Sequence, residues 1–160
     1  MERSRTILVP KDLELPITDK RIAKIFREMR NLLVRTYTNT VVILLRIFLE
    51  MSADVYLEKF QLMPDGVLTA SQSKLSLYSK IKKVITHLHA THVANRDMTK
   101  GMEMEIDNVN SPLSPQTLNA YIHNYRLSPI ADNLIIEWDN IQPFIVCLWD
   151  AVSHKEEPKP

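Results

Sequence analysis

The chain has 160 residues, of which 45% are hydrophobic and 24% are charged, and its formal net charge is +1. This length and composition predict one packed domain with a sizeable core, rather than a disordered or membrane-embedded chain. Only 2 glycines are present, Gly66 and Gly101, and neither lies in the glycine-rich pattern of a Rossmann or Walker phosphate loop. Nucleotide binding of those two types is therefore not expected.

The pattern of prolines and apolar residues divides the chain into three parts. Residues 1–17 contain Pro10 and Pro16 and predict an extended arm or linker, which either docks on the domain or hangs free. Residues 18–152 show helical periodicity and predict a single helical-bundle domain, and residues 153–160 predict a disordered tail. Because the arm has no obvious structure of its own, we expect a piece of a longer protein.

Two helices are expected in the first part of the domain. The first begins at Thr18, which serves as its N-cap. Its apolar residues recur with the spacing of one buried stripe, namely Ile22, Ile25, Phe26, Met29, Leu32 and Leu33. The second runs from about Asn39 to about Leu62, where the turn residues Pro64-Asp65-Gly66 close it. The first half of this second helix is apolar nearly all round, which is typical of the central helix of a bundle.

Further helical segments follow along the chain. One is expected over residues 73–89, and a shorter one after Asp97. Two Ser-Pro pairs have the order typical of helix starts, and they predict helices over about 114–123 and about 128–140. The last segment contains Pro143, and the sequence leaves open whether this proline starts a new helix or kinks a continuous one. The whole chain thus predicts an all-α bundle of about five to seven helices.

The cysteine count and the first residues bear on the compartment. Cys147 is the only cysteine, so no disulfide can form within the chain, and its apolar surroundings predict a core position. The N-terminal sequence lacks the apolar region and the cleavage site of a signal peptide. The longest apolar run, residues 40–45, is far shorter than the roughly 20 residues of a spanning helix. We therefore expect a cytoplasmic protein without a membrane segment.

Positive and negative charges are separated along the chain. Residues 1–100 carry 17 Lys+Arg against 10 Asp+Glu, and residues 101–160 carry 3 against 9, which gives +7 and −6. Much of the positive charge lies in two blocks, which comprise Lys20, Arg21, Lys24, Arg27, Arg30 and Arg35, and then Lys74, Lys80, Lys82 and Lys83. On one shared exposed face these blocks would bind the phosphates of RNA or DNA. The alternative is that they are the solvated faces of amphipathic helices.

Arg46 and Glu50 interrupt the most apolar helix of the chain. At a spacing of i and i+4 they share one helix face. A charge in that setting lies at the bundle surface or is buried and paired, because an isolated buried ion costs several kcal/mol. Two interpretations stay open: an ion pair that fixes the helix register, or two side chains that line a polar cleft.

A second polar group lies in the helix expected over 114–123. Asn119 and His123 share a face there, and Asn124 follows at the helix end. A histidine near a helix C-terminus is favoured in its protonated form and can act as a general acid or base. The alternative is a capping or hydrogen-bonding role.

A third pattern, His87, His89 and His92, resembles a metal-binding run. On a helix His87 and His89 point about 200° apart, and no nearby cysteine or carboxylate completes a ligand set. No metal or other cofactor is therefore expected. The nucleophile elbow of Ser-His-Asp hydrolases is also missing from the sequence.

Two segments, ILLRIFLEMSADVYLEKF at 43–60 and LNAYIHN at 118–124, together resemble the HEPN superfamily. These are helical-bundle domains of prokaryotic toxin, abortive-infection and other defence systems, and they often end a larger multidomain protein. The longer segment is similar to the long helix of such domains, and the shorter one resembles the place of their signature. The resemblance extends from about Thr18 to about Trp149 and implies a homodimer.

The family signature is an Arg followed after four to six residues, often through Asn, by a His. The His falls on His123 and the Asn on Asn119, whereas the Arg position holds Leu118. In catalytic members the Arg and His of two subunits meet at a dimer cleft and cleave RNA without a metal, and the cation stabilises the phosphorane charge. Leu118 cannot do this, and Arg46 or Arg126 are the candidates to replace it.

Three functional hypotheses follow. The first is a non-catalytic or weakly catalytic HEPN-like domain that mediates homodimerisation or assembly of a larger bacterial defence-type protein, with a nucleic-acid-facing basic surface. The alternative is a metal-independent endoribonuclease toxin that uses His123, Asn119 and a displaced arginine, with Arg46 and Glu50 as further candidate site residues. A weaker alternative is a DNA-binding module, which the basic first helix permits although no helix-turn-helix is recognisable.

Overall fold

The fold is helical throughout the residues that the computed structural model describes, which are 5–64, 73–108, 111 and 114–156. The helices are α1 (Lys20–Asn31), α2 (Thr38–Lys59), α3 (Leu77–Ala90), α4 (Arg96–Asp107), α5 (Pro115–His123) and α6 (Ala131–Glu156). Within these ranges no strand forms, and one isolated bridge pairs Ile7 with Leu33. The predicted all-α bundle of five to seven helices is confirmed.

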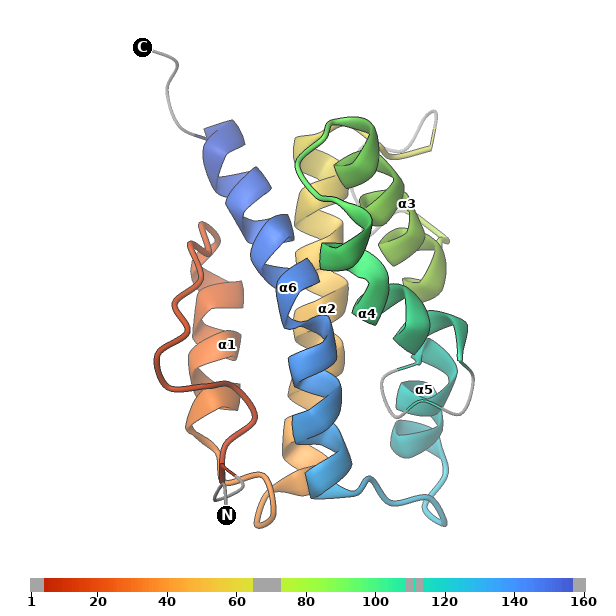
Figure 1. Cartoon of the computed structure of the whole chain (residues 1–160). Helices are drawn as coiled ribbons and strands as arrows, with labels where there is room; N and C mark the ends of the chain where they lie inside the picture. Colours follow the sequence, from red (N-terminus) through yellow and green to blue (C-terminus); the bar gives the residue numbers. More distant parts are fainter. Residues whose placement is uncertain (1–4, 65–72, 109–110, 112–113, 157–160) are drawn as a thin grey trace.

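Helices α2 and α6 form the centre of the bundle (Figure 1). Helix α1 packs on one side of α2, while α3 and α5 pack on the other, and α4 lies against α6. The rings of Phe26, Phe48 and Trp138 meet where α1, α2 and α6 converge, with centroids 5.4 to 6.5 Å apart. Farther along, the indole N–H of Trp149 on α6 donates to the buried hydroxyl of Ser52 on α2, at 3.2 Å.

The ends of the first helix differ from the sequence-based expectation. Asp19 is the N-cap in place of Thr18, because its carboxylate accepts the Ile22 amide at 2.9 Å. The first four residues of the predicted stripe are buried, but Leu33 is 49% exposed because the helix ends at Asn31. The stripe is therefore shorter than its sequence periodicity indicates.

The two Ser-Pro pairs have different outcomes. Ser114 caps α5 by accepting the Thr117 amide, and Pro115 stands at the helix start as predicted. The second pair precedes α6, which begins only at Ala131. Helix α6 then continues through the exposed Pro143 to Glu156, so the proline lies within one continuous helix. Residues 153–156, expected in the disordered tail, are thus helical, whereas residues 157–160 and the turn residues 65–66 lie outside the described residues.

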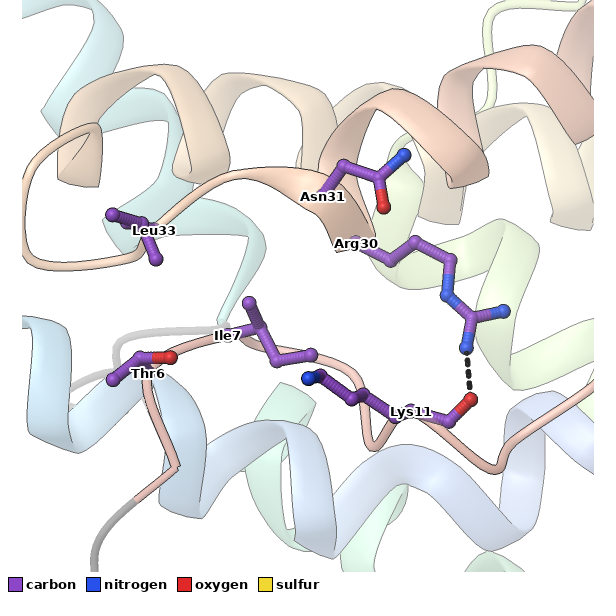
Figure 2. A pocket seen from close by; sticks show the side chains of 6 residues that line it. All are labelled: Thr6, Ile7, Lys11, Arg30, Asn31 and Leu33. Atoms are coloured by element: carbon purple, nitrogen blue, oxygen red, sulfur yellow. Dashed lines mark hydrogen bonds between the residues drawn. The ribbon is translucent and has the colours of Figure 1, made fainter.

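The arm docks on the domain over its described residues. Leu8 and Val9 are fully buried in the core, and Arg5 reaches α6, where its guanidinium lies 2.6 Å from the carboxylate of Asp139. Arg30 of α1 donates to the carbonyl of Pro10 at 3.2 Å and to that of Lys11 at 2.8 Å, and the second of these bonds is drawn in Figure 2. A surface hollow of ≈ 560 Å³ lies between this part of the arm and the end of α1.

Gly101 permits the close crossing of α4 and α6. A Cβ atom built at this glycine would lie 1.9 Å from the carbonyl oxygen of Asn140 on α6. No side chain fits such a gap without moving a helix backbone, so the crossing requires a glycine in the middle of α4, where it costs helix propensity.

Among the helices of the described chain, none is long and apolar enough to cross a bilayer.

Candidate polar site between α2 and α5

Arg46 and Glu50 form an ion pair on α2. Arg46 Nη1 lies 2.8 Å from Glu50 Oε2, and their side chains are 24% and 30% exposed. The helix geometry brings them together, because residues four apart lie above one another on the same face. The pair lies at the edge of the core, and the ion pair itself is the part of the two interpretations that the structure describes.

Asn119 joins this pair from α5. Arg46 Nε donates to Asn119 Oδ1 at 3.2 Å. The guanidinium thus bridges a carboxylate of its own helix and an amide of a helix that lies 73 positions further along the chain. Three of the four candidate site residues, Arg46, Glu50 and Asn119, are brought together by this contact.

His123, the fourth candidate, is the last residue of α5 and is exposed. It follows Asn119 by one helical turn, and in the described part of the chain its side chain forms no hydrogen bond or ion pair. Its imidazole is therefore accessible from solvent near Asn119 without being fixed there. Leu118, at the position of the family's arginine, is fully buried and packs in the core, so this position faces away from that surface.

Lys80 of α3 lies behind Glu50 and balances its charge. Its side chain is only 5% exposed, and its ammonium lies 3.3 Å from Glu50 Oε1 and 2.8 Å from Asp54 Oδ1. Burial raises the pKa of Asp54 above its ordinary value, against the opposing charge of Lys80. Burial alone would lower the pKa of Lys80, but Asp54 and Glu50 raise it, so the ammonium stays charged.

Burial removes two of the expected nucleic-acid-binding residues from the surface. Lys80 is enclosed by carboxylates, and Arg30, with a side chain 14% exposed, is directed at the arm carbonyls. Lys82 is half-exposed and pairs with Asp107 at 3.1 Å. The exposed members of the set are Lys20, Arg21, Lys24, Arg27 and Lys83. The two basic blocks do not share one face, because α1 and α3 lie on opposite sides of α2 (Figure 1).

The histidine run is divided among separate hydrogen bonds. His87 Nδ1 lies 2.6 Å from the Tyr56 hydroxyl, and His89 Nε2 lies 2.7 Å from the Thr99 hydroxyl. His92 is exposed and has a positive φ of 58°. In the described ranges no group of three His, Cys, Asp or Glu side chains is arranged to hold a metal ion.

A second buried acid, Glu105 of α4, was missed by sequence reasoning. Burial first, and the neighbouring carboxyl of Glu137 on α6 second, raise the pKa of Glu105 to about 8. Ser111 donates its hydroxyl to Glu105 Oε2, and the Asn140 amide lies 3.5 Å from Oε1. The carboxyl of Glu105 therefore keeps its proton at neutral pH.

The sequence did contain a signal for the burial of both Lys80 and Glu105. Lys80 lies three residues after Leu77 and four before Val84, which places it in the apolar stripe of α3. Glu105 follows Met102 by three residues and adjoins Ile106, which places it in the stripe of α4. A charged residue in the middle of an apolar stripe indicates a buried polar network, whereas its partners on other helices are set only by the fold.

Comparison with protein families, with curated proteins and with solved structures finds no match to this chain. The resemblance to the HEPN superfamily therefore stays a prediction from the two sequence segments.

We expect Glu105→Gln to flatten the pH dependence of stability. The folded state holds a proton on Glu105 up to about pH 8, whereas the unfolded chain loses it near the ordinary value of 4.5. The free energy of unfolding therefore falls as the pH rises between these values, and the neutral amide removes this loss, which exceeds about 1 kcal/mol. Urea unfolding at about pH 5 and about pH 8 measures it. Glu103→Gln, on the same helix, is the control, and equal slopes in both variants would contradict the assignment.

Proposed function

We propose that this chain is an HEPN-like helical domain, non-catalytic or weakly catalytic, that mediates homodimerisation of a larger bacterial defence-type protein. The dimer forms through the surface between α2 and α5, and a separate basic surface of the domain faces nucleic acid. The observation that carries the proposal is the hydrogen bond from Arg46 to Asn119, with His123 one turn away. This contact supports the proposal that the surface between α2 and α5 corresponds to the dimer cleft of the HEPN superfamily.

Exposed apolar side chains adjoin this polar contact. Ile43 precedes Arg46 by one turn and Ile122 follows Asn119 by one turn, and the two helices run antiparallel (Figure 1). Both isoleucines therefore lie on the same side of the Arg46–Asn119 bond. The apolar surface, defined as Ile43, Ile122, Tyr125, Leu127 and Ile130, continues into the α5–α6 connection, where Tyr125 is 88% exposed.

A second copy of the chain is the occupant that we propose for this surface. Contiguous apolar side chains at the surface of a soluble domain mark interaction sites. A two-fold contact brings the same patch of both copies together, so that Ile122 and Tyr125 of each copy are covered at once. The charge of Arg46 is balanced by Glu50. This pairing supports a structural role, in which the ion pair fixes the register of the helices, more than a catalytic one.

We expect the wild-type chain to have twice its 18.6 kDa mass in solution at micromolar concentration. The variant Ile122→Glu/Tyr125→Glu is expected to be monomeric, because it places buried charges at the centre of the contact. Light scattering with size-exclusion chromatography measures both masses. Met104→Glu, which places a charge on an exposed apolar side chain of α4, is the control and stays dimeric. A monomeric wild-type chain would overturn the proposal.

The endoribonuclease is the second candidate, and the position of Arg46 favours it specifically. The guanidinium is held by an amide of α5 at 3.2 Å, next to the helix end that bears His123. In such a site His123 takes the proton of the ribose 2′-hydroxyl as its oxygen attacks phosphorus, and Arg46 stabilises the charge that develops on phosphate. The bond to the 5′ oxygen of the next nucleotide breaks, this oxygen leaves with a proton returned by the imidazolium, and a 2′,3′-cyclic phosphate remains.

If the chain cleaves RNA, we expect His123→Ala to reduce the rate by roughly 100-fold or more, because a general acid–base group contributes about that factor. Arg46→Ala is expected to reduce it similarly, while His92→Ala, at an exposed position away from α5, leaves it unchanged. The cleavage of a labelled RNA in the presence of a chelator measures these rates. Undiminished cleavage by the His123 variant excludes this mechanism.

A further inference from the structure

We infer that one face of α1 is a binding surface for the phosphate backbone of nucleic acid, independent of base sequence. This surface, the α1 stripe, consists of Lys20, Lys24 and Arg27, and it ends at the hollow where Lys11 of the arm lies (Figure 2). The inference deepens one part of the proposed function, the nucleic-acid-facing surface, and is independent of the dimer.

Helix geometry aligns the stripe. Residues 20, 24 and 27 recur at i, i+4 and i+7, so their side chains project from one face, and all three are exposed. Asn31 extends the same row by one more turn and lines the hollow together with Lys11. From Lys20 to Arg27 the helix rises about 10 Å, which spans about three phosphates along one strand of a duplex.

Few negative charges oppose these cations. Within the described chain, the side chains of Lys20 and Arg27 form no ion pair or hydrogen bond. Lys24 makes a long contact of 3.8 Å with Glu28, and both side chains of this pair are mostly exposed. Arg21 points elsewhere, since it adjoins a hollow that contains Asp54 and Glu58, and it is left out of the stripe.

Four other cations of the two basic blocks already have partners within the molecule. Lys80 is buried with two carboxylates, Lys82 pairs with Asp107, and Arg35 pairs with Asp132 at 2.8 Å. Arg30 donates hydrogen bonds to two carbonyls of the arm. The stripe is thus a row of three cations on one helix face that are not enclosed by carboxylates or held by the arm.

The chemistry of the stripe favours nucleic acid over a membrane or an acidic protein. The apolar residues of α1, Ile22, Ile25, Phe26 and Met29, are buried against the core, so the exposed face has nothing to insert into a bilayer. Three acids of the rear half, Asp107, Asp132 and Asp139, are paired within their own chain, which reduces the attraction of a second copy. A backbone with regularly spaced phosphates fits a row of flexible cations.

The test measures the binding of the full chain to fluorescently labelled duplex DNA, duplex RNA and single-stranded RNA of about 20 nucleotides. Three to four phosphate contacts predict a loss of affinity of roughly 50- to 150-fold between about 50 and 200 mM salt. Lys24→Glu/Arg27→Glu is expected to weaken binding at least tenfold and to reduce the salt dependence. The control Arg96→Glu/Lys100→Glu changes the net charge equally at two exposed positions of α4 and leaves the affinity within about twofold.

Three results would overturn the inference. They are an affinity that does not depend on salt, an equal loss in the two charge-reversal variants, and binding to phosphatidylserine vesicles with none to nucleic acid. Light scattering on the same samples keeps this test separate from the dimer proposal. A monomer that still binds through the stripe refutes only the dimer, and a dimer without nucleic-acid affinity refutes only the stripe.

Discussion

The buried ammonium of Lys80 is the constraint on which the polar part of this structure depends. It lies between Glu50 and Asp54, two carboxylates one turn apart on α2, and it brings α3 against the same helix face. Removing an ion from water costs several kcal/mol, so the cluster is stable only because both partners are in place. Glu50 in turn holds Arg46, and Arg46 reaches Asn119 of α5. One buried charge thereby connects three helices and determines the direction of the guanidinium at the candidate site.

Opposite charges that lie far apart in the sequence pair with one another in the folded molecule, which the near-neutral net charge alone does not show. Cations of the basic front pair with acids of the acidic rear inside one molecule: Arg5 with Asp139, Arg35 with Asp132 and Lys82 with Asp107. These pairs connect the arm and the residues after α1 to α6, and they connect α3 to α4. The charges that are separated along the chain therefore help to hold the helices together. Such surface pairs contribute little individually, about 0 to 1 kcal/mol, but they decide which cations remain for a partner.

Periodicity predicted the helices well and their connections less well. The buried apolar residues of α1 and the Ser114 cap follow from local spacing and local hydrogen bonding, which the sequence shows directly. The exposure of Leu33 depends on where α1 stops, and the requirement for Gly101 depends on how closely α4 crosses α6. For the candidate site, the Arg46–Glu50 pair is an i, i+4 contact and was predictable, whereas the approach of Asn119 is a tertiary contact across 73 positions. The spacing of residues in the sequence predicts contacts within one helix, but it does not predict how the helices are placed relative to one another.

The role of Lys80 is tested most directly by urea unfolding of the full chain with Lys80→Met. Methionine keeps the apolar length of the side chain but leaves Asp54 without its cation and Glu50 with Arg46 alone. Because these carboxylates are partly exposed, we expect a loss of about 2 kcal/mol, less than for a fully buried pair. Lys83→Met, an exposed position on the same helix, is the control and changes stability by less than about 0.5 kcal/mol. A Lys80→Met variant as stable as the wild type would contradict the account.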